Sequence, residues 1–507
     1  MRYMNINVLE LVEHSAVCYP DKVAVREGEE TVTYTQLVQR SQKVGSVLAG
    51  KNAVKTPVGV FMEKGIAALC AFFGAAYAGN CYCMFNVELP EHRLQQIQTV
   101  LSPKYMITTR DLLPKAEQIF HDTCILVIED MLETPVDETA LQQVRKTVID
   151  TDPLYINFTS GSTGVPKGIA VSHRSVLDFI SCFTKTFGIT EKDIIANQAP
   201  FDFDVSVKDI YSSMAVGAEL VIVPRALFSA PVPLLDYLCE HQITTMIWAV
   251  SALCLISTFH GLDYKTPCTV NKILFSGEVM PCKHLREWQK HLPEAMYVNL
   301  YGPTEITCNC TYHILQKGRD YADGIPIGKP FPNEDVFLLD EQRHLVKESG
   351  KTGMITVRGT ALALGYYGCP EKTAESFIQN PLQSYYPETV YLTGDLGYWN
   401  DEGELVYCGR SDHQIKYMGH RVELEEVERA MTAVEGVERC ICVFDEKRQR
   451  LKGYYVGTID KNVLHKTLRE TLPFFMIPNF LQPIQSVVLS KNGKIDRKKT
   501  IEQIGGK

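Results

Sequence analysis

The stretch "INFTSGSTGVPKGIAVSH" (residues 156–173) breaks an apolar run with a loop of small and polar residues. Between Thr159 and Gly168 the loop holds three glycines, two serines, two threonines and one lysine. Glycines let backbone N–H groups turn toward a ligand, hydroxyls add hydrogen-bond donors, and a lysine adds positive charge. The composition therefore predicts a loop that binds a polyanion. A flexible linker of similar composition would not normally lie between apolar strands.

The spacing within this loop excludes the Walker A motif. That motif reads G-x-x-x-x-G-K-[ST], whereas here Lys167 follows Pro166 and precedes Gly168. We therefore expect a phosphate-binding loop of a different kind.

Strand-like and helical stretches alternate on both sides of the loop. Upstream, the apolar residues 56–62 lead into an Ala-rich helical segment at 65–79. Downstream, apolar residues recur with the spacing i, i+4, i+7 and i+11 of one helix face, at Val176, Ile180, Phe183 and Phe187. The alternation predicts an α/β fold with largely parallel sheets.

The pattern of expected elements changes near residue 333, where strands become shorter and are separated by turns. This change predicts a compact β subdomain at about 333–411. A charged stretch at Arg410–Asp412 is the expected boundary between an N-terminal lobe, 1–411, and a small α+β C-terminal lobe, 412–507.

Charge and composition narrow the expected partners. The net charge is −9, which disfavours nucleic acid. Residues 413–507 nevertheless carry 17 Lys and Arg against 12 Asp and Glu, which suits an anionic partner or merely a solvated surface. The longest apolar run, 66–79, is shorter than the roughly 20 residues of a membrane helix, so we expect no membrane insertion.

The sixteen cysteines include no CxxC pair, which favours free thiols in a reducing cytoplasm. Three CxC pairs occur, and we expect each to place two small apolar residues on one face of a strand: Cys81/Cys83, Cys308/Cys310 and Cys440/Cys442.

Six ordered motifs along almost the whole chain resemble those of the adenylate-forming (AMP-binding) superfamily, in its amino-acid-activating branch. They are "FTSGSTGVPKG" (158–168), "FDFDVSVKDIY" (201–211), "NLYGPTE" (299–305), "YLTGDLGYW" (391–399), "GRSDHQIKYMGHRVELEEVE" (409–428) and "NGKIDR" (492–497). Nonribosomal peptide synthetase adenylation domains and D-alanine–carrier protein ligases belong to this branch. The resemblance implies a β-barrel-like subdomain at 333–411 and a mobile C-terminal lobe.

The resemblance also implies a reaction and its residues. A carboxylate attacks the α-phosphorus of ATP with Mg²⁺, and a thiol then takes the acyl group. Lys494 would bridge the carboxylate and the α-phosphate, Thr304 would contact the α-phosphate, and Glu305 would ligate Mg²⁺. Asp412 would be the pivot of the mobile lobe, and Gly419 would line the channel for the thiol. The expected nucleotide-binding residues are Thr159, Ser160, Gly161, Ser162, Thr163, Gly164, Lys167, Gly277, Glu278, Asn299, Tyr301, Gly302, Asp395, Tyr407 and Arg410.

Asp204 matches the aspartate that pairs with the substrate's α-ammonium group, although a helix cap beside Asp202 is the alternative. Lys208 could face the pocket and favour a larger, acidic or amide side chain, or turn outward and pair with Asp209. By the same resemblance the substrate pocket is lined by Asp204, Val205, Lys208, Ile247, Leu274, Ser276, Leu300, Cys308 and Asn309.

The function expected from the resemblance is activation of an amino acid and its transfer to the phosphopantetheine thiol of an acidic carrier protein. In D-alanine–carrier protein ligases, Cys usually stands at the position of Ser276 and an apolar residue at that of Lys208, so both departures count against D-alanine. An acyl-CoA synthetase for a non-amino acid is the alternative enzyme. A nucleotide-binding scaffold without activity is disfavoured because the charged motif residues are all present.

Overall fold

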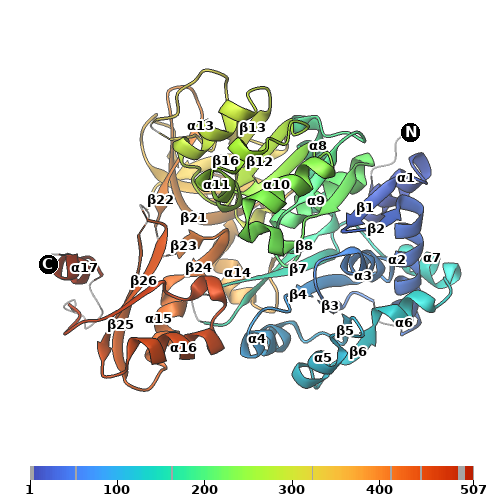
Figure 1. Cartoon of the computed structure of the whole chain (residues 1–507), viewed down its shortest axis with the longest axis horizontal. Coiled ribbons are helices and arrows are strands. Elements are labelled where there is room, and N and C mark those ends of the chain that lie inside the picture. Colours follow the sequence, from blue (N-terminus) through green and yellow to red (C-terminus); the bar gives the residue numbers. More distant parts are fainter. Residues whose placement is uncertain are drawn as a thin grey trace. The chain divides into compact units, whose positions relative to one another are not determined.

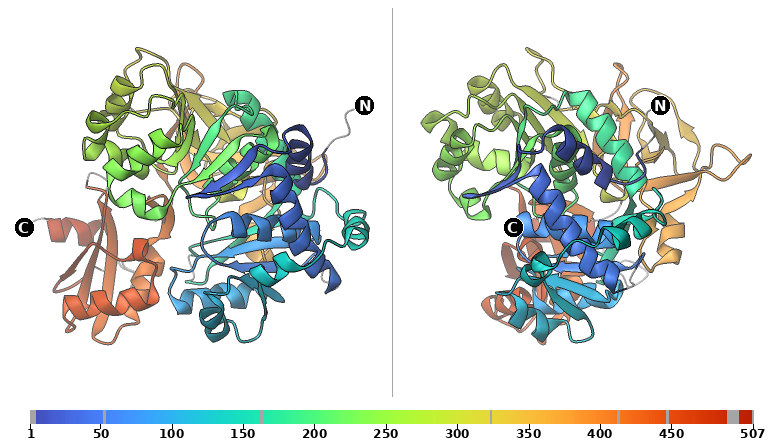
Figure 2. Two further views of the ribbon diagram at one scale, coloured as in Figure 1. Left: turned by 45° about the vertical axis from the view of Figure 1, so that its right-hand side comes forward. Right: turned by 90° about the vertical axis from the view of Figure 1, so that its right-hand side faces the viewer.

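The computed structural model describes residues 5–51, 54–161, 164–322, 324–411, 414–445, 448–488 and 497–505. The chain divides into two compact units (Figure 1, Figure 2). Unit 1 comprises residues 1–87, 100–158 and 168–411, and unit 2 comprises residues 88–99, 159–167 and 412–507.

A nine-stranded sheet forms one half of unit 1. Its six central strands run parallel, and antiparallel strands close both edges. In spatial order the strands are β15 (Lys329–Pro330), β14 (Thr311–Ile314), β13 (Met296–Tyr301), β12 (Lys272–Ser276), β11 (Thr245–Ala249), β9 (Ile194–Asn197), β10 (Glu219–Ile222), β1 (Val23–Glu27) and β2 (Glu30–Thr33).

A second, seven-stranded sheet has five parallel strands, β7 and β3 to β6. In spatial order its strands are β19 (Gly365–Tyr366), β8 (Lys167–Ser172), β7 (Pro153–Thr159), β4 (Cys81–Phe85), β3 (Pro57–Phe61), β5 (Tyr105–Thr108) and β6 (Cys124–Val127). The two sheets confirm the expected α/β class with largely parallel strands.

Helices connect and cover these strands. The predicted apolar face between Val176 and Phe187 lies on α8, and its four apolar residues are buried. No helix among the described residues is long and apolar enough to span a membrane. The helices of unit 1 are α1 (Leu9–Cys18), α2 (Tyr34–Gly50), α3 (Ile66–Tyr77), α5 (Leu113–Ile119), α6 (Ile128–Glu133), α7 (Glu138–Arg145), α8 (His173–Phe187), α9 (Val205–Val216), α10 (Pro231–Glu240), α11 (Val250–Thr258), α12 (Gly261–Tyr264), α13 (Cys282–His291) and α14 (Pro370–Ser376), with short 3₁₀ turns at Arg225–Ser229 and Thr304–Ile306.

Helix α9 contacts strands of both sheets. The Tyr211 hydroxyl lies 2.9 Å from the Tyr82 hydroxyl on β4, and Lys208 Nζ donates to Ser276 Oγ on β12 at 3.2 Å. Since side chains alternate along a strand, the nine-stranded sheet faces α9 on one side and carries α10, α11 and α13 on the other (Figure 1). The carboxyl ends of β11 to β13 are thereby placed beside the start of α9.

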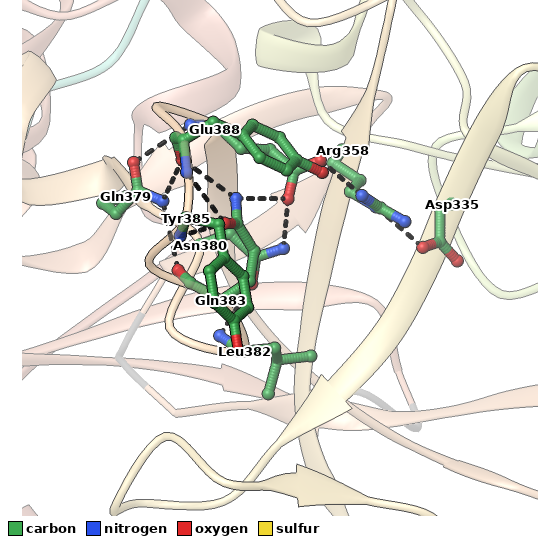
Figure 3. A network of polar contacts seen from close by, with 9 residues as sticks. Asp335, Arg358, Gln379, Asn380, Leu382, Gln383, Tyr385 and Glu388 are labelled. Atoms are coloured by element: carbon green, nitrogen blue, oxygen red, sulfur yellow. Dashed lines mark hydrogen bonds and ion pairs between the residues drawn. The ribbon is translucent and has the colours of Figure 1, made fainter.

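An antiparallel six-stranded sheet follows in the chain and confirms the expected β-rich subdomain. In Figure 3, Arg358 lies between Asp335 and Glu388 and contacts both carboxylates, while Asn380 also donates to Glu388. This network ties the loop before β21 to two neighbouring strands. The strands are β17 (Leu345–Val346), β16 (Glu334–Leu339), β18 (Gly353–Gly359), β21 (Thr389–Trp399) and β20 (Phe377–Gln379), with β22 (Leu405–Arg410) on β21.

Unit 2 is an α+β assembly with its own core. Helix α4 (Glu91–Leu101) begins within it. The other elements are β23 (Gln414–Tyr417), β24 (His420–Glu423), α15 (Leu424–Thr432), β25 (Val437–Asp445), β26 (Arg450–Gly457), α16 (Lys461–Thr471), a 3₁₀ turn at Phe474–Met476, β27 (Phe480–Pro483) and α17 (Arg497–Gly505).

The expectation for the CxC pairs holds for two of the three. Cys81 and Cys83 are buried on β4, and Cys440 and Cys442 are buried on β25. The strand expected at Cys308/Cys310 is wrong, because Thr307 and Cys308 have positive φ angles of 43° and 76° and form a tight turn before β14. That turn brings Cys308 toward α9.

Candidate active site

A buried carboxylate stands at the centre of the predicted nucleotide-binding residues of unit 1. Asp395 on β21 pairs in register with Arg410 on β22, and Arg410 Nη1 donates to Asp395 Oδ1 at 2.5 Å. The Tyr301 hydroxyl, at the end of β13, donates to the other carboxylate oxygen at 2.6 Å. Burial and the Asp395 charge hold the pKa of Tyr301 well above its usual range, so the hydroxyl remains a donor. Three residues predicted from separate motifs are thus in direct contact.

The segment after β13 positions Glu305. A 3₁₀ turn at Thr304–Ile306 buries both Thr304 and Glu305. The Tyr366 hydroxyl donates to Glu305 Oε1 at 2.9 Å, and the Ala363 N–H donates to the Glu305 carbonyl at 2.8 Å. Sequence reasoning missed Tyr366, because it lies on β19, far along the chain and outside every motif. The Glu305 side chain is therefore held from outside its own loop.

Gly302 is required by a close approach of backbone. A Cβ at this position would lie 2.4 Å from Asn309 Cα and 2.8 Å from both Cys308 O and Cys310 N. The turn that carries Cys308 and Asn309 therefore packs directly on Gly302. Gly302 therefore fixes the turn of Cys308 and Asn309 next to the segment that leads into the 3₁₀ turn at Thr304–Ile306.

Other predicted nucleotide-binding residues lie around this cluster. Asn299 Nδ2 donates to the Pro326 carbonyl at 2.9 Å. The Tyr407 ring lies 6.2 Å from the Tyr301 ring, centroid to centroid. Gly277 follows β12 with φ at 94°, a conformation that favours glycine, and Glu278 is half-buried beside it.

The polyanion loop belongs to unit 2 in its described part, 159–161 and 164–167. Gly161 N donates to Glu426 Oε2 at 3.2 Å, and Ser160 Oγ donates to the Arg421 carbonyl at 2.7 Å. Glu426 in turn forms a buried ion pair with Arg93, 2.7 Å long. Burial raises the pKa of Glu426, and Arg93 opposes that rise. The loop's backbone N–H group is thus shown to bind a carboxylate within the unit.

Ser162, Thr163, Asp412 and Lys494 lie outside the described residues. Of the remaining ones, Thr159 ends β7, Lys167 begins β8, and Gly164 and Gly419 have φ angles of 84° and 79°.

The apolar part of the predicted substrate pocket lies on one face of three neighbouring strands. Ile247 pairs in register with Leu274, and Ser276 pairs with Leu300. Because residues i and i+2 of a strand share a face, these four side chains face the same side of the sheet. Lys208 reaches Ser276 on that side, so it is the side that α9 covers.

The polar part of the pocket lies on α9 and on the Cys308 turn. Asp204 occupies the N-cap position of α9, but its side chain makes no capping hydrogen bond, so the helix-cap alternative gains no support. Lys208 Nζ donates to Asn309 Oδ1 at 2.8 Å as well as to Ser276 Oγ. Cys308 Sγ donates to the Asp204 carbonyl at 3.1 Å, and Val205 is buried beside it. The structure therefore turns Lys208 toward the predicted pocket residues.

Sequence reasoning also missed Tyr155 on β7, whose buried hydroxyl has no hydrogen-bond partner among the described residues. Burial, the Cys308 thiol and the Asp204 carboxylate all raise its pKa, so Tyr155 lies within electrostatic reach of the pocket. One further group of acidic and histidine side chains among the described residues, Asp263, Glu287 and His291, brings ligand atoms within 4.8 Å of one another, away from these motifs.

Comparisons with known proteins identify the family of this chain. The family model described as "AMP-binding enzyme" matches residues 12–367. Zwittermicin A synthase ZmaJ of Bacillus cereus is 30% identical over 98% of the chain and 94% of its own length. Tyrocidine synthase 1 of Brevibacillus parabrevis is 30% identical over 97% of the chain, which spans only 44% of that relative.

A solved structure of holo-PA1221, a nonribosomal peptide synthetase protein containing adenylation and PCP domains, superposes with a TM-score of 0.84. It covers 99% of this chain and 85% of its own, at 22% identity, and so supports the fold. The family match spans most of the chain and contains the motifs at 158–168, 201–211 and 299–305. The chain therefore belongs to the AMP-binding enzymes and is an adenylate-forming enzyme, a ligase by class, that uses ATP.

Proposed function

We propose that this enzyme activates an amino acid as its aminoacyl adenylate and transfers it to the phosphopantetheine thiol of a carrier protein. The observation that carries the proposal is Asp204, a carboxylate 6% exposed at the start of α9 beside the predicted pocket strands. By resemblance, the aspartate at this position pairs with the α-ammonium group of the substrate, and a carboxylate beside the pocket strands can accept such a charge-assisted hydrogen bond.

The proposed reaction has two steps. The substrate carboxylate attacks the α-phosphorus of ATP, a new P–O bond forms, and the bond to the β-phosphate breaks to release pyrophosphate. The carrier thiolate then attacks the acyl carbon and AMP leaves. Two anions meet in the first step, so neutralisation of charge dominates catalysis. Lys494 is the proposed catalytic cation and Thr304 the proposed α-phosphate contact.

The nucleotide-binding roles follow from the described contacts. Asp395, held between Tyr301 and Arg410, would accept the ribose hydroxyls. The loop at 159–167 would hold the β- and γ-phosphates, in keeping with the carboxylate that Gly161 N already binds. Glu305 offers a buried carboxylate, the hard oxygen ligand that Mg²⁺ prefers, and would hold that ion, which neutralises phosphate charge when bound.

An ATP–pyrophosphate exchange assay over the amino acids, both enantiomers of alanine included, tests the first step. We expect amino-acid-dependent exchange in the wild type and nearly none in Lys494→Ala, with unchanged unfolding and largely intact thioester transfer from preformed adenylate. Near-normal exchange by Lys494→Ala would remove this residue from the mechanism.

The second candidate is an acyl-CoA synthetase for a non-amino acid. Exchange with fatty or aryl acids but with no amino acid, together with thioester formation on CoA, would favour it. The proposed carrier protein is supported by the positive charge of residues 413–507, which suits an acidic partner, and by a shared fold with a protein that contains adenylation and PCP domains. Sixteen free thiols support a cytoplasmic location.

A further inference from the structure

A buried histidine on β14 is hydrogen-bonded at both ring nitrogens. His313 is 3% exposed. Its Nδ1 lies 2.7 Å from Glu404 Oε1, and its Nε2 lies 2.9 Å from the Tyr321 hydroxyl. Because a carboxylate only accepts, Nδ1 carries the proton and donates to Glu404, and Nε2 accepts from the tyrosine. Burial lowers the pKa of His313, which favours this neutral form. We call these three side chains the His313 triad.

The triad fixes the described residues of the segment 315–328, which connects β14 to β15. The Tyr321 hydroxyl also accepts from the Gln316 N–H at 2.9 Å, so it holds the start of the segment. At the far end, Gly328 and Leu405 exchange two backbone hydrogen bonds of 3.1 and 2.8 Å. Since Leu405 follows the triad's glutamate directly, side-chain and backbone bonds from one part of β22 hold both ends of the segment.

The same segment orients the amide of Asn299. Asn299 lies directly opposite His313 in the antiparallel pair of β13 and β14, so the two side chains lie on one face of the sheet. Asn299 Nδ2 donates to the Pro326 carbonyl at 2.9 Å, and only the NH₂ arm of an amide can donate to a carbonyl. This bond aims Oδ1, the acceptor arm, away from Pro326. An acceptor there suits the exocyclic amine of adenine, the role expected of Asn299, and opposes a purine that carries a carbonyl instead.

We propose that the His313 triad is a positioning element for adenine recognition. It holds the segment whose Pro326 carbonyl orients the Asn299 amide, so that the site prefers ATP to inosine triphosphate (ITP), whose base has a carbonyl in place of the amine. This inference rests on the nucleotide-binding role proposed for Asn299. It adds three positioning residues that lie outside every sequence motif and act through Asn299.

Calorimetric titration of the full chain with ATP and with ITP measures this preference in the absence of any acid substrate. We expect the wild type to bind ATP about 10-fold more tightly than ITP, the effect of one hydrogen bond. His313→Phe keeps a planar ring that bonds neither partner. It should lower the ATP-to-ITP affinity ratio by about 3- to 10-fold, because a released Asn299 amide can turn its NH₂ arm toward the inosine carbonyl. An unchanged ratio, or equal weakening for both nucleotides, would show a merely structural role and overturn the inference.

Tyr321→Phe is the second variant, because it removes a single hydroxyl and keeps the ring in its apolar surroundings. We expect a smaller fall in the same ratio. Glu404→Gln should keep the ratio of the wild type, since its amide oxygen still accepts from His313 Nδ1. The matched control is Tyr297→Phe, on β13, whose hydroxyl bonds the Leu292 carbonyl. A fall of the ratio in this control as large as in Tyr321→Phe would contradict the inference.

Amino-acid-dependent pyrophosphate exchange, measured in parallel, separates this inference from the proposed function. Equal affinities of the wild type for ATP and ITP would overturn the inference and leave amino-acid activation standing. Absence of exchange with every amino acid would overturn amino-acid activation, while the affinity ratios would still decide whether the triad orients Asn299.

Discussion

Arg410→Met would remove the cation of a buried ion pair in unit 1. The side chains of Arg410 and Asp395 are 9% and 2% exposed and lie 2.5 Å apart. At an effective dielectric constant of 20, this separation corresponds to about 7 kcal/mol of attraction, much of which desolvation offsets. Loss of one partner from such a pair typically costs about 3–5 kcal/mol. Since the Tyr301 hydroxyl still donates to Asp395, we expect the lower end, about 3 kcal/mol.

Tryptophan fluorescence reports this change selectively, because all three tryptophans, Trp248, Trp288 and Trp399, lie in unit 1. Urea unfolding followed by fluorescence should show a lower midpoint for Arg410→Met. The double variant Asp395→Asn/Arg410→Met removes both charges and should return to within about 1 kcal/mol of the wild type.

Binding of ATP separates structure from function in the same experiment. Both variants should lose ATP affinity, because the proposed ribose carboxylate is either misplaced or absent. An unchanged midpoint for Arg410→Met, or a double variant less stable than the single one, would refute the reasoning that the pair is a buried, mutually compensating unit.

Two further predictions concern unit 1. Gly302→Ala should lower both amino-acid-dependent exchange and the fluorescence-detected stability, the latter by about 1–3 kcal/mol, because its Cβ would overlap the backbone at Asn309. The matched control is Gly50→Ala, where a Cβ meets nothing within 4 Å. Equal behaviour of the two variants would contradict the packing argument. His173 is buried and accepts from the Val8 N–H, and burial lowers its pKa to about 4, so the unfolded chain takes up a proton first as pH falls. Stability should therefore decline between about pH 6.5 and 4, by up to about 3 kcal/mol. His173→Asn should flatten this decline, and a parallel pH profile would exclude His173 as its source.

Much of the fold follows from local sequence patterns. The apolar spacing on α8 and the alternating strands and helices predict elements that the structure contains. Such elements can be predicted because the apolar periodicity of a helix or strand lies within its own segment of sequence. Motif residues such as Asp395, Arg410 and Tyr301 also meet in space. The contact of Tyr301 with Asp395 could be expected only from the resemblance, since β13 lies far from β21 along the chain, whereas β21 and β22 are consecutive antiparallel strands.

Contacts between distant segments could not be predicted from local patterns. Nothing near Tyr366 indicates that it bonds Glu305, and the direction of Lys208 depends on where the Asn309 turn lies. The strand expected at Cys308 is wrong because a close approach to Gly302 imposes a turn that a two-residue alternation cannot reveal. Segments 88–99 and 159–167 likewise join unit 2 through pairing such as Arg93 with Glu426, which no single stretch of sequence encodes.

Strand β13 explains how one element can serve two proposed substrates. Since side chains alternate along a strand, Asn299 and Tyr301 share one face, and Leu300 points to the other. Leu300 pairs in register with Ser276 in the predicted pocket, while Tyr301 contacts the proposed ribose carboxylate. Substitutions at Leu300 can therefore reshape the pocket without removing a nucleotide contact. Gly302, one residue further, couples the two faces, because the turn carrying Asn309 packs on it. Substitutions at Leu300 can therefore change substrate specificity, whereas Gly302 must stay small because the backbone of the Asn309 turn packs on it.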